Sequence, residues 1–235
     1  MTAGARPRIG IVAHPELIRD PDEHDEMLHY VVAAPYVKAV RKAGAVPIVL
    51  AAVDASDIEP LLDSVDAAVI TGGCDIDPST YGASPHPKLG VLNPARDEID
   101  IEFARALVAR DQPTLAVCRG IQVLDVALGG TLAQHVDEHM RLDAYNADVH
   151  PVKIESGSTL ATVMGGTEVG VNTLHHQVID TLGPRVHAVA WNPDGHVEGI
   201  EVRGAPHILG VQWHPELLRH RPEHLALFEW LVASR

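Results

Sequence analysis

The sequence has few cysteines and few aromatic residues. Two cysteines in 235 residues are too few for a disulfide framework and fit a reducing compartment. Neither belongs to a Cys-x-x-Cys pair, which argues against a zinc ribbon. Aromatic residues make up 4% of the chain, whereas 46% is hydrophobic. The core must therefore be mainly aliphatic, and this apolar content argues against general disorder.

Positive charge is also scarce. Eighteen Lys and Arg face 32 Asp and Glu, which gives a net charge of −14 with the 15 His counted as neutral. This balance argues against binding to nucleic acid or to an anionic membrane surface. No uncharged apolar run approaches the roughly 20 residues of a membrane span, and a signal peptide needs a longer apolar stretch than residues 9–13. We therefore expect a cytoplasmic protein.

Short apolar runs alternate with helical patterns in the first half of the chain. This order predicts a parallel sheet with helices on its faces. The expected strands are 9–13, 46–52, 67–71 and 114–117, and the expected helices are 30–43, 57–62, 97–110 and 120–128. Residues 14–29 and 74–94 have the polar composition of loops.

The second half is richer in strand patterns. Strands are expected at 149–154, 169–172, 186–191, 197–202 and 208–212, followed by a helix at 221–234. They predict an antiparallel extension of the same sheet. The length suits one α/β domain spanning residues 1–235.

Cys118 lies where a predicted strand meets a predicted helix. Such a turn can form a nucleophile elbow, which needs small neighbours like Ala116 and Gly120. A helix N-terminus also favours a thiolate. The alternative is a buried cysteine that acts as a small hydrophobe. The segment alone leaves both interpretations open.

A base and an orienting acid are available elsewhere in the chain. His214 and Glu216 stand two apart at a strand end, so they can lie on one side of the chain. The carboxylate could hold one imidazole nitrogen and leave the other facing a thiol. Alternatively, His214 is a surface residue beside a glutamate that begins a helix.

Gly72 and Gly73 follow another predicted strand. Glycines there let the backbone approach a ligand closely. Their amides could form one side of an oxyanion hole, with the amide of Arg119 as the other. An ordinary glycine turn is the alternative.

These segments, taken in order, resemble the class I glutamine amidotransferase-like superfamily. The closest resemblance is to its γ-glutamyl-γ-aminobutyrate hydrolase-like branch of cysteine peptidases. The resemblance covers the chain from about residue 30 onward. Its blocks are Tyr36-Val-Lys-Ala-Val, Ala43-Gly44, Gly72-Gly73-x-Asp75-x-Asp77-Pro78, Tyr81-Gly82, Arg96-Asp97, Cys118-Arg119-Gly120-x-Gln122, Ala127-Leu-Gly-Gly-Thr-Leu, Gln134-His135, Val171-Asn172-x-x-His175-His176-Gln177 and Gly210-Val-Gln-Trp-His-Pro-Glu216.

The resemblance implies a fold and a reaction. The fold is a flavodoxin-like three-layer α/β sandwich, and the reaction is cleavage of a γ-glutamyl amide to glutamate and an amine through a thioester. Carried over by position, Cys118 is the nucleophile, His214 the base and Glu216 the residue that orients it. Oxyanion positions fall on Gly73 and Arg119, and substrate positions on Gly72, Gln122 and His176.

No cofactor or metal is expected, and the partner is a small γ-glutamyl molecule, with a homodimer left open. His135 and His139 stand four apart, a spacing that could place two metal ligands on one helical face. A solvated loop is the favoured interpretation there. Two other functional classes stay open: a glutaminase subunit that delivers ammonia to a synthetase, and a binding protein without catalysis.

Some residues depart from the family pattern or have no place in it. Asp125 stands where the family usually has Asn. The acidic stretch from Asp20 to Glu26 could attract a cationic amine, although a solvated loop is favoured. Cys74 could be inert packing, which is favoured, or lie close enough to Cys118 to matter under oxidation. Arg119 is the nearest cation in sequence for the carboxylate of a γ-glutamyl group.

Overall fold

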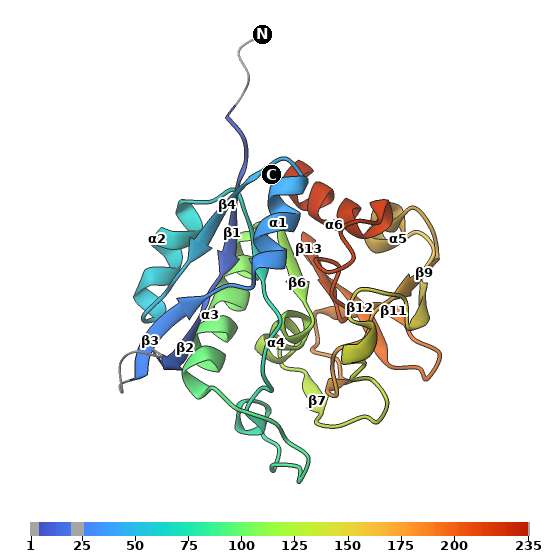
Figure 1. The fold of residues 1–235 in the computed structure, drawn as a ribbon, viewed down its shortest axis with the longest axis horizontal. Coiled ribbons are helices and arrows are strands. Elements are labelled where there is room, and N and C mark those ends of the chain that lie inside the picture. The colour runs from blue at the N-terminus through green and yellow to red at the C-terminus, as the bar shows by residue number, and fades with distance from the viewer. Residues whose placement is uncertain (1–4, 20–25, 235) are drawn as a thin grey trace.

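A sheet of nine strands crosses the molecule (Figure 1). The computed structural model describes residues 5–19 and 26–234. The strands follow one another across the sheet in the order β4 (Val46–Leu50), β1 (Arg8–Val12), β5 (Ala67–Ile70), β6 (Thr114–Val117), β13 (Ala205–Val211), β12 (Val197–Val202), β11 (Val186–Trp191), β8 (His150–Ile154) and β9 (Glu168–Val171).

The sheet has a parallel half and an antiparallel half, which meet at β13. Every neighbouring pair from β4 to β13 is parallel. Every pair from β13 to β9 is antiparallel. The predicted mostly parallel sheet with an antiparallel extension is therefore confirmed.

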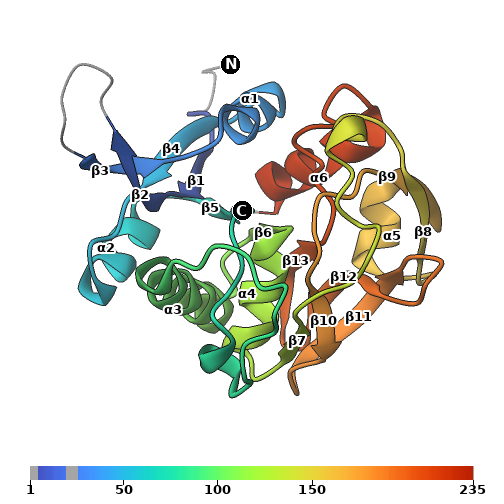
Figure 2. The same ribbon diagram turned by 60° about the horizontal axis from the view of Figure 1, so that its bottom comes forward.

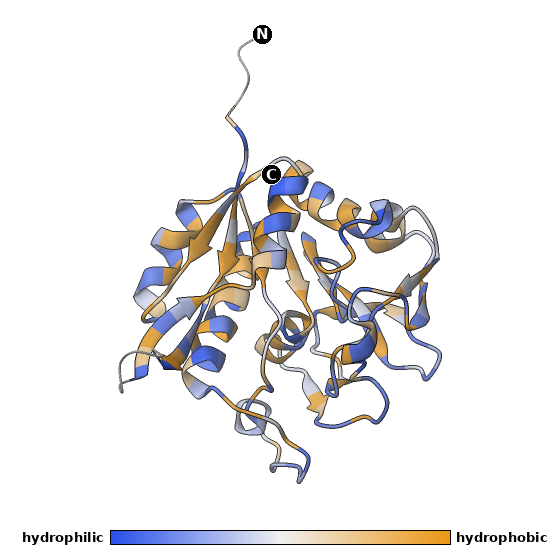
Figure 3. Ribbon diagram, viewed as in Figure 1, coloured by the Kyte–Doolittle hydropathy of each residue, from blue (hydrophilic) through white to orange (hydrophobic). Residues whose placement is uncertain are grey.

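Helices cover both faces of the sheet (Figure 2). Strand residues alternate between the faces, so that Leu115 and Val117 pack in one apolar cluster and Ala116 in the other. The first face carries α1 (Ala34–Lys42), α5 (Thr159–Met164) and α6 (Pro222–Ala233), and the second carries α2 (Ile58–Asp63), α3 (Pro94–Arg110) and α4 (Arg119–Ala127). The parallel strands are almost wholly apolar (Figure 3), as expected for strands buried on both faces.

Two pairs of short strands lie outside the main sheet. β7 (Thr131–Ala133) pairs with β10 (Val178–Thr181), and β2 (His14–Arg19) pairs with β3 (Glu26–Val31). Short 3-10 helices occur at Ala55–Asp57, Pro78–Tyr81 and Leu142–Ala144. Among the described residues, no helix combines the length and apolar character that a membrane span requires.

The hairpin formed by β2 and β3 corrects two sequence predictions. Residues 14–29 are not simply a polar loop, and the helix expected from residue 30 begins at Ala34 because β3 extends to Val31. The strands could not be recognised from the sequence because the segment is rich in charged residues and has no buried face. Leu17, Met27 and Leu28 remain more than half exposed in the hairpin. The short helix α5, capped by the Ser158 side chain, was missed as well.

Candidate active site

Three loops converge at the carboxyl ends of adjacent parallel strands. β5, β6 and β13 are neighbours in the sheet. Gly72 and Gly73 follow β5, Cys118 follows β6, and His214 follows β13. The strand order therefore brings together predicted site residues from three distant parts of the chain. They meet at the edge of the sheet where open α/β sheets bind their ligands.

Cys118 occupies a strained turn between β6 and α4. Its backbone has φ 54° and ψ −109°, a conformation that residues with a side chain rarely adopt. The Cys118 amide donates to the carbonyl of Val211 at 2.8 Å, which fixes the end of the strand. Close packing fixes the start of the helix, because a Cβ at Gly120 would lie 2.4 Å from the carbonyl oxygen of Ile70. The elbow expected from the sequence is present.

Gly120→Ala should therefore lower the free energy of unfolding. The added methyl meets a backbone atom that cannot rotate away, and overpacking of this kind costs about 1–3 kcal/mol. Gly166→Ala is the matched control, because a Cβ there would have no neighbour within 4 Å. Urea unfolding of both variants measures the difference. Equal unfolding midpoints would contradict the tight packing described for the elbow.

His214 lies between an acid and the thiol. Its Nδ1 is 2.6 Å from Oε1 of Glu216, a carboxylate that is almost fully buried. Burial alone would lower the pKa of His214, but the charges of Cys118 and Glu216 outweigh it and raise that pKa well above its usual value. The Cβ position of Gly72 is 2.9 Å from His214 Cε1 and 3.4 Å from Cys118 Cβ. The two side chains therefore meet directly above the Gly72 backbone.

Two residues that the sequence analysis left without a role support this arrangement. Asn172 accepts the amide of His214 at 2.9 Å and donates to the carbonyl of the same residue at 3.2 Å. Tyr36 accepts the amide of Gly72 at 2.9 Å through its hydroxyl. Burial and the charge of Glu216 raise the pKa of Tyr36 well above its usual value. Both residues stood in the family blocks, which was the only signal that could have singled them out.

A buried arginine supports the Gly72–Gly73 loop. Nη2 of Arg96 donates to the carbonyl of Gly72 at 2.8 Å and to the Thr71 hydroxyl at 3.3 Å. A Cβ at Gly73 would lie 1.9 Å from Nη1 of Arg96, so the guanidinium occupies the space that a side chain at this position would need. Arg96 thus fixes the loop at Gly73, the position predicted to supply one oxyanion amide.

The side chain of Arg119 is not available to bind the carboxylate of a substrate, which was the role suggested for it. Its guanidinium donates to Asp97 at 2.5 Å and also to Asp100, and all three side chains are buried. Burial on its own would lower the pKa of Arg119, but the two carboxylates outweigh it and hold the guanidinium charged. The side chain is therefore committed to this network and does not offer its charge to a substrate. The Arg119 amide begins α4 and has no acceptor within that helix.

One cavity adjoins Cys118, and a second opens beside Gly73 and Cys74. The smaller, of about 40 Å³, is lined by Cys118, Gln122, His176 and neighbouring residues. Gln122 donates to the carbonyl of Gln177 at 2.9 Å, and His176 Nε2 lies 2.9 Å from Asp75 Oδ1. Gly73 and Cys74 also line the larger cavity, of about 830 Å³, which extends to the β2–β3 hairpin. Cys74 is thus partly exposed between the two.

The acidic stretch from Asp20 to Glu26 lies almost wholly outside the described residues. Only Glu26 is described, at the start of β3. The predicted attraction of this stretch for a cationic amine therefore remains a prediction.

Asp125, which stands where the family usually has Asn, places a carboxyl group in the core of the protein. Its side chain is fully buried, Oδ1 accepts the Gly183 amide at 2.9 Å, and Oδ2 has no hydrogen-bond partner. Burial raises the pKa of Asp125 from 3.8 to about 7. The native state thus retains a proton that the unfolded chain releases near pH 4. The contribution of this bound proton to the free energy of unfolding is complete below pH 4 and is lost as the pH rises through 7.

Asp125→Asn should remove this loss of stability. At pH 8 the variant is expected to have the higher free energy of unfolding, by at most about 4 kcal/mol at ~1.4 kcal/mol per pH unit. The difference from the wild type should shrink as the pH falls towards 4. Urea unfolding at several pH values measures it, and other titrating groups cancel between the two proteins. A constant difference across this range would contradict the assignment.

The profile of the Peptidase C26 family matches residues 7–216. The chain belongs to this family. The resemblance to class I glutamine amidotransferase-like proteins, and to their γ-glutamyl-γ-aminobutyrate hydrolase-like branch, is thereby confirmed. At this level the protein is a glutamine amidotransferase-like hydrolase.

Proteins from several bacteria are similar over most of the chain. The Mycobacterium tuberculosis protein named "Putative glutamine amidotransferase Rv2859c" is 37% identical, over 97% of this chain and 74% of its own length. Protein NtpR of Enterococcus hirae is 34% identical, over 90% and 91%. The γ-glutamyl-γ-aminobutyrate hydrolase PuuD of Escherichia coli is 33% identical, over 77% and 76%.

A solved structure supports the fold. A glutamine amidotransferase from Thermotoga maritima superposes with a TM-score of 0.57 at 15% identity, covering 90% of this chain and 76% of its own. The predicted class of fold, a mostly parallel sheet between layers of helices, is therefore confirmed.

Proposed function

We propose that the protein hydrolyses the γ-glutamyl amide of a small amine, releasing glutamate and the free amine through a thioester on Cys118. One observation carries the proposal. His214 stands between Glu216 and Cys118, with Nδ1 held at 2.6 Å by the carboxylate, so its other nitrogen is available to the thiol. A nucleophile, a base and an orienting acid in this order are the requirements of covalent acyl transfer.

In the first half of the reaction, the Cys118 thiolate attacks the γ-carbonyl carbon of the substrate. The resulting oxyanion accepts hydrogen bonds from the Gly73 and Arg119 amides. Protonated His214 donates its proton to the amine nitrogen, the C–N bond breaks, and the amine leaves a γ-glutamyl thioester behind.

In the second half, neutral His214 takes a proton from water while the water oxygen attacks the thioester carbon. The C–S bond breaks, glutamate leaves, and the thiolate and the imidazolium are restored. The elevated pKa of His214 suits this cycle, because it favours the protonated imidazole that must donate to the leaving amine.

The larger cavity favours an amine with an aliphatic chain. It opens beside Gly73 and Cys74 and is walled by the apolar side chains of Leu17, Leu28, Val53, Val91, Leu92 and Ile99. An aliphatic leaving group could bury apolar surface there, whereas ammonia could not. PuuD, whose name states activity on γ-glutamyl-γ-aminobutyrate, provides a precedent for such a substrate among the relatives.

A glutaminase subunit is the second candidate, because the M. tuberculosis relative bears an amidotransferase name. It would use the same cysteine and histidine but would release ammonia. Its activity would require a synthetase partner or would rise when one is added.

A panel of γ-glutamyl amides tests the proposal. It includes γ-glutamyl derivatives of aliphatic amines that end in a neutral, a cationic or an anionic group, and glutamine. We expect kcat/KM for at least one aliphatic amide to exceed that for glutamine by about tenfold or more, as burial of two or so methylene groups would give. Hydrolysis of glutamine alone would favour the glutaminase subunit. Hydrolysis of no member of the panel would refute the proposed substrate class.

A further inference from the structure

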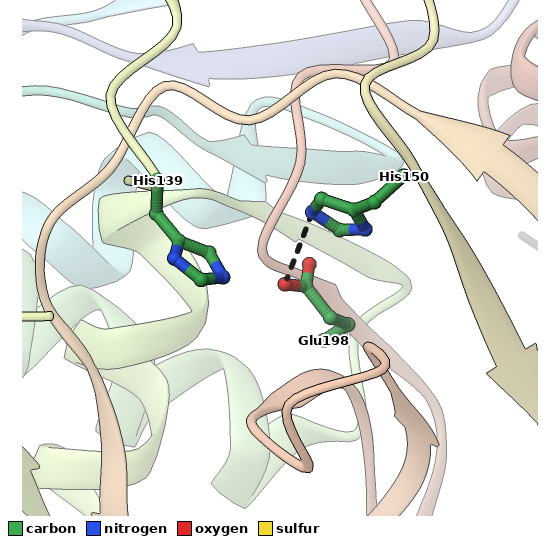
Figure 4. A group of neighbouring side chains, drawn as sticks. All are labelled: His139, His150 and Glu198. Carbon is green, nitrogen blue, oxygen red and sulfur yellow. Dashed lines mark ion pairs between the residues drawn. The ribbon is translucent and has the colours of Figure 1, made fainter. Parts of the chain in front are cut away.

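Two histidines and a glutamate that have no part in the proposed hydrolysis gather at one place (Figure 4). Nitrogen atoms of His139 and His150 and an oxygen of Glu198 all lie within 4.8 Å of one another. His175 lies next to these three residues, with Nε2 at 3.7 Å from Glu198 Oε1, and it also lines the small cavity at Cys118. The four residues come from the segment after β7, the start of β8, the segment before β10 and β12.

This group overturns part of the sequence interpretation. Residues 134–139 are not helical, so the spacing of His135 and His139 does not place them on a helix face. His135 lies beside His176, with their Nδ1 atoms 3.1 Å apart. His139 is only 6% exposed, so the predicted solvated loop does not describe it.

The three imidazoles share one orientation. Nδ1 lies 2.9 Å from the Asp137 carbonyl in His139, 3.1 Å from the Pro151 carbonyl in His150, and 3.1 Å from the Gln177 carbonyl in His175. A carbonyl only accepts, so Nδ1 carries the proton and Nε2 carries the lone pair. Histidines that bind metals are oriented by this same kind of bond on the opposite nitrogen.

The lone pairs face a buried carboxylate. Glu198 is 0% exposed and its Oε2 has no hydrogen-bond partner. Nε2 of His150 and of His175 are also buried without partners. Within 4 Å of this carboxylate, the ion-pair partners found among residues 5–19 and 26–234 are His150 and His175. Imidazole lone pairs and carboxylate oxygens are all hydrogen-bond acceptors, so they repel one another unless a cation or a proton lies between them.

We propose that His139, His150, His175 and Glu198 bind one divalent transition-metal ion of the zinc type. Three imidazole nitrogens and one carboxylate oxygen form a donor set that Zn²⁺ accepts in four-coordinate sites. Asn192 now donates to His139 Nε2 at 2.8 Å and to Glu198 Oε1 at 3.3 Å, and metal binding requires that it give up both bonds. With four protein ligands, the site has a structural role and supplies no chemistry to hydrolysis.

The position of the group indicates what the ion would hold together. The carbonyl of His139 accepts the His175 amide at 3.1 Å and the Thr173 hydroxyl at 2.8 Å. A metal would add a second link between these segments and anchor both to β12. The segment it fixes contains His176, which lines the cavity at Cys118. The inference does not depend on the proposed substrate, because binding is measured without turnover.

Metal binding to the untagged full-length protein tests the inference. Cys118→Ala serves as the background, so that no thiolate at the elbow can bind the ion. After removal of metal by a chelator and incubation with Zn²⁺, we expect one equivalent bound per chain and a rise in melting temperature. Co²⁺ in place of zinc should give the visible absorption of a four-coordinate site. Less than about a tenth of an equivalent, with no such absorption, would overturn the proposal. The protein would then hold a proton at Glu198, whose pKa burial raises to about 8.

Variants locate the site. Glu198→Gln and His150→Ala should each weaken Zn²⁺ binding by about 100-fold or more. His187→Ala, which changes a histidine with an exposed side chain, should leave it unchanged. His150 is partly exposed, so His150→Ala carries the test even if Glu198→Gln does not fold. Binding that survives both ligand variants, or that is lost in His135→Ala instead, would overturn the assignment.

Discussion

Replacing Cys118 with alanine is expected to lower hydrolysis of γ-glutamyl amides by about 10⁴-fold or more. Loss of a nucleophile from a triad has effects of this size, because no other group forms the covalent intermediate. The fold should be retained, since alanine keeps the Cβ of Cys118 and removes one buried atom. Steady-state kinetics and urea unfolding of the same preparation measure the two effects separately.

Cys74 provides a matched control. It is the other cysteine of the chain, and it lines both the small cavity at Cys118 and the larger cavity next to it. Cys74→Ala should retain activity within a few-fold and should still react with one equivalent of a thiol-directed electrophile at neutral pH, at Cys118. Activity that survives Cys118→Ala, or an equal loss in Cys74→Ala, would contradict the assignment of the nucleophile.

Glu216→Gln is expected to lower kcat by about 10²–10⁴-fold, as in other triads in which an amide replaces the orienting carboxylate. The carboxylate now accepts at 2.6 Å from Nδ1 of His214. Glutamine can donate to that nitrogen, which would favour the wrong tautomer of the ring. The substitution also removes the negative charge of Glu216, which raises the pKa of His214.

The pH profile separates this effect from a structural one. The leaving amine needs protonated His214, so activity falls as the pH rises through the pKa of the imidazolium. Removing the carboxylate lowers that pKa, and the alkaline limb of kcat/KM should therefore move to lower pH. Glu155→Gln is the control, since Glu155 pairs with His187 at 3.5 Å on the surface. An unchanged alkaline limb together with a loss of activity would assign Glu216 a structural role.

The sequence predicted the parallel half of the fold because its signals are local. Residues 114–117 form an apolar run that ends at a turn, and β6 has those same bounds. The β2–β3 hairpin was missed because its apolar residues stand in adjacent pairs rather than alternating with polar ones, and most of its side chains are exposed. Strands of this kind gain stability from pairing with each other, which no single segment reveals.

The candidate site could be predicted in its residues but not in its supports. Cys118, His214 and Glu216 stood in blocks with a known order, and the structure brings them together at one sheet edge. The guanidinium of Arg119 illustrates the limit, since its two carboxylate partners lie on α3. The group of His139, His150, His175 and Glu198 has no short spacing that would mark it as a metal site. Only the folded chain places those residues together.

The central claim is that hydrolysis proceeds through a γ-glutamyl thioester on Cys118. Hydroxylamine tests it most directly, because it competes with water for the thioester and yields γ-glutamyl hydroxamate. Two substrates that share the glutamyl group but release different amines would pass through the same intermediate. We expect the same ratio of hydroxamate to glutamate from both substrates, and neither product from Cys118→Ala. A ratio that depends on the leaving amine, or hydrolysis that yields no hydroxamate, would contradict it.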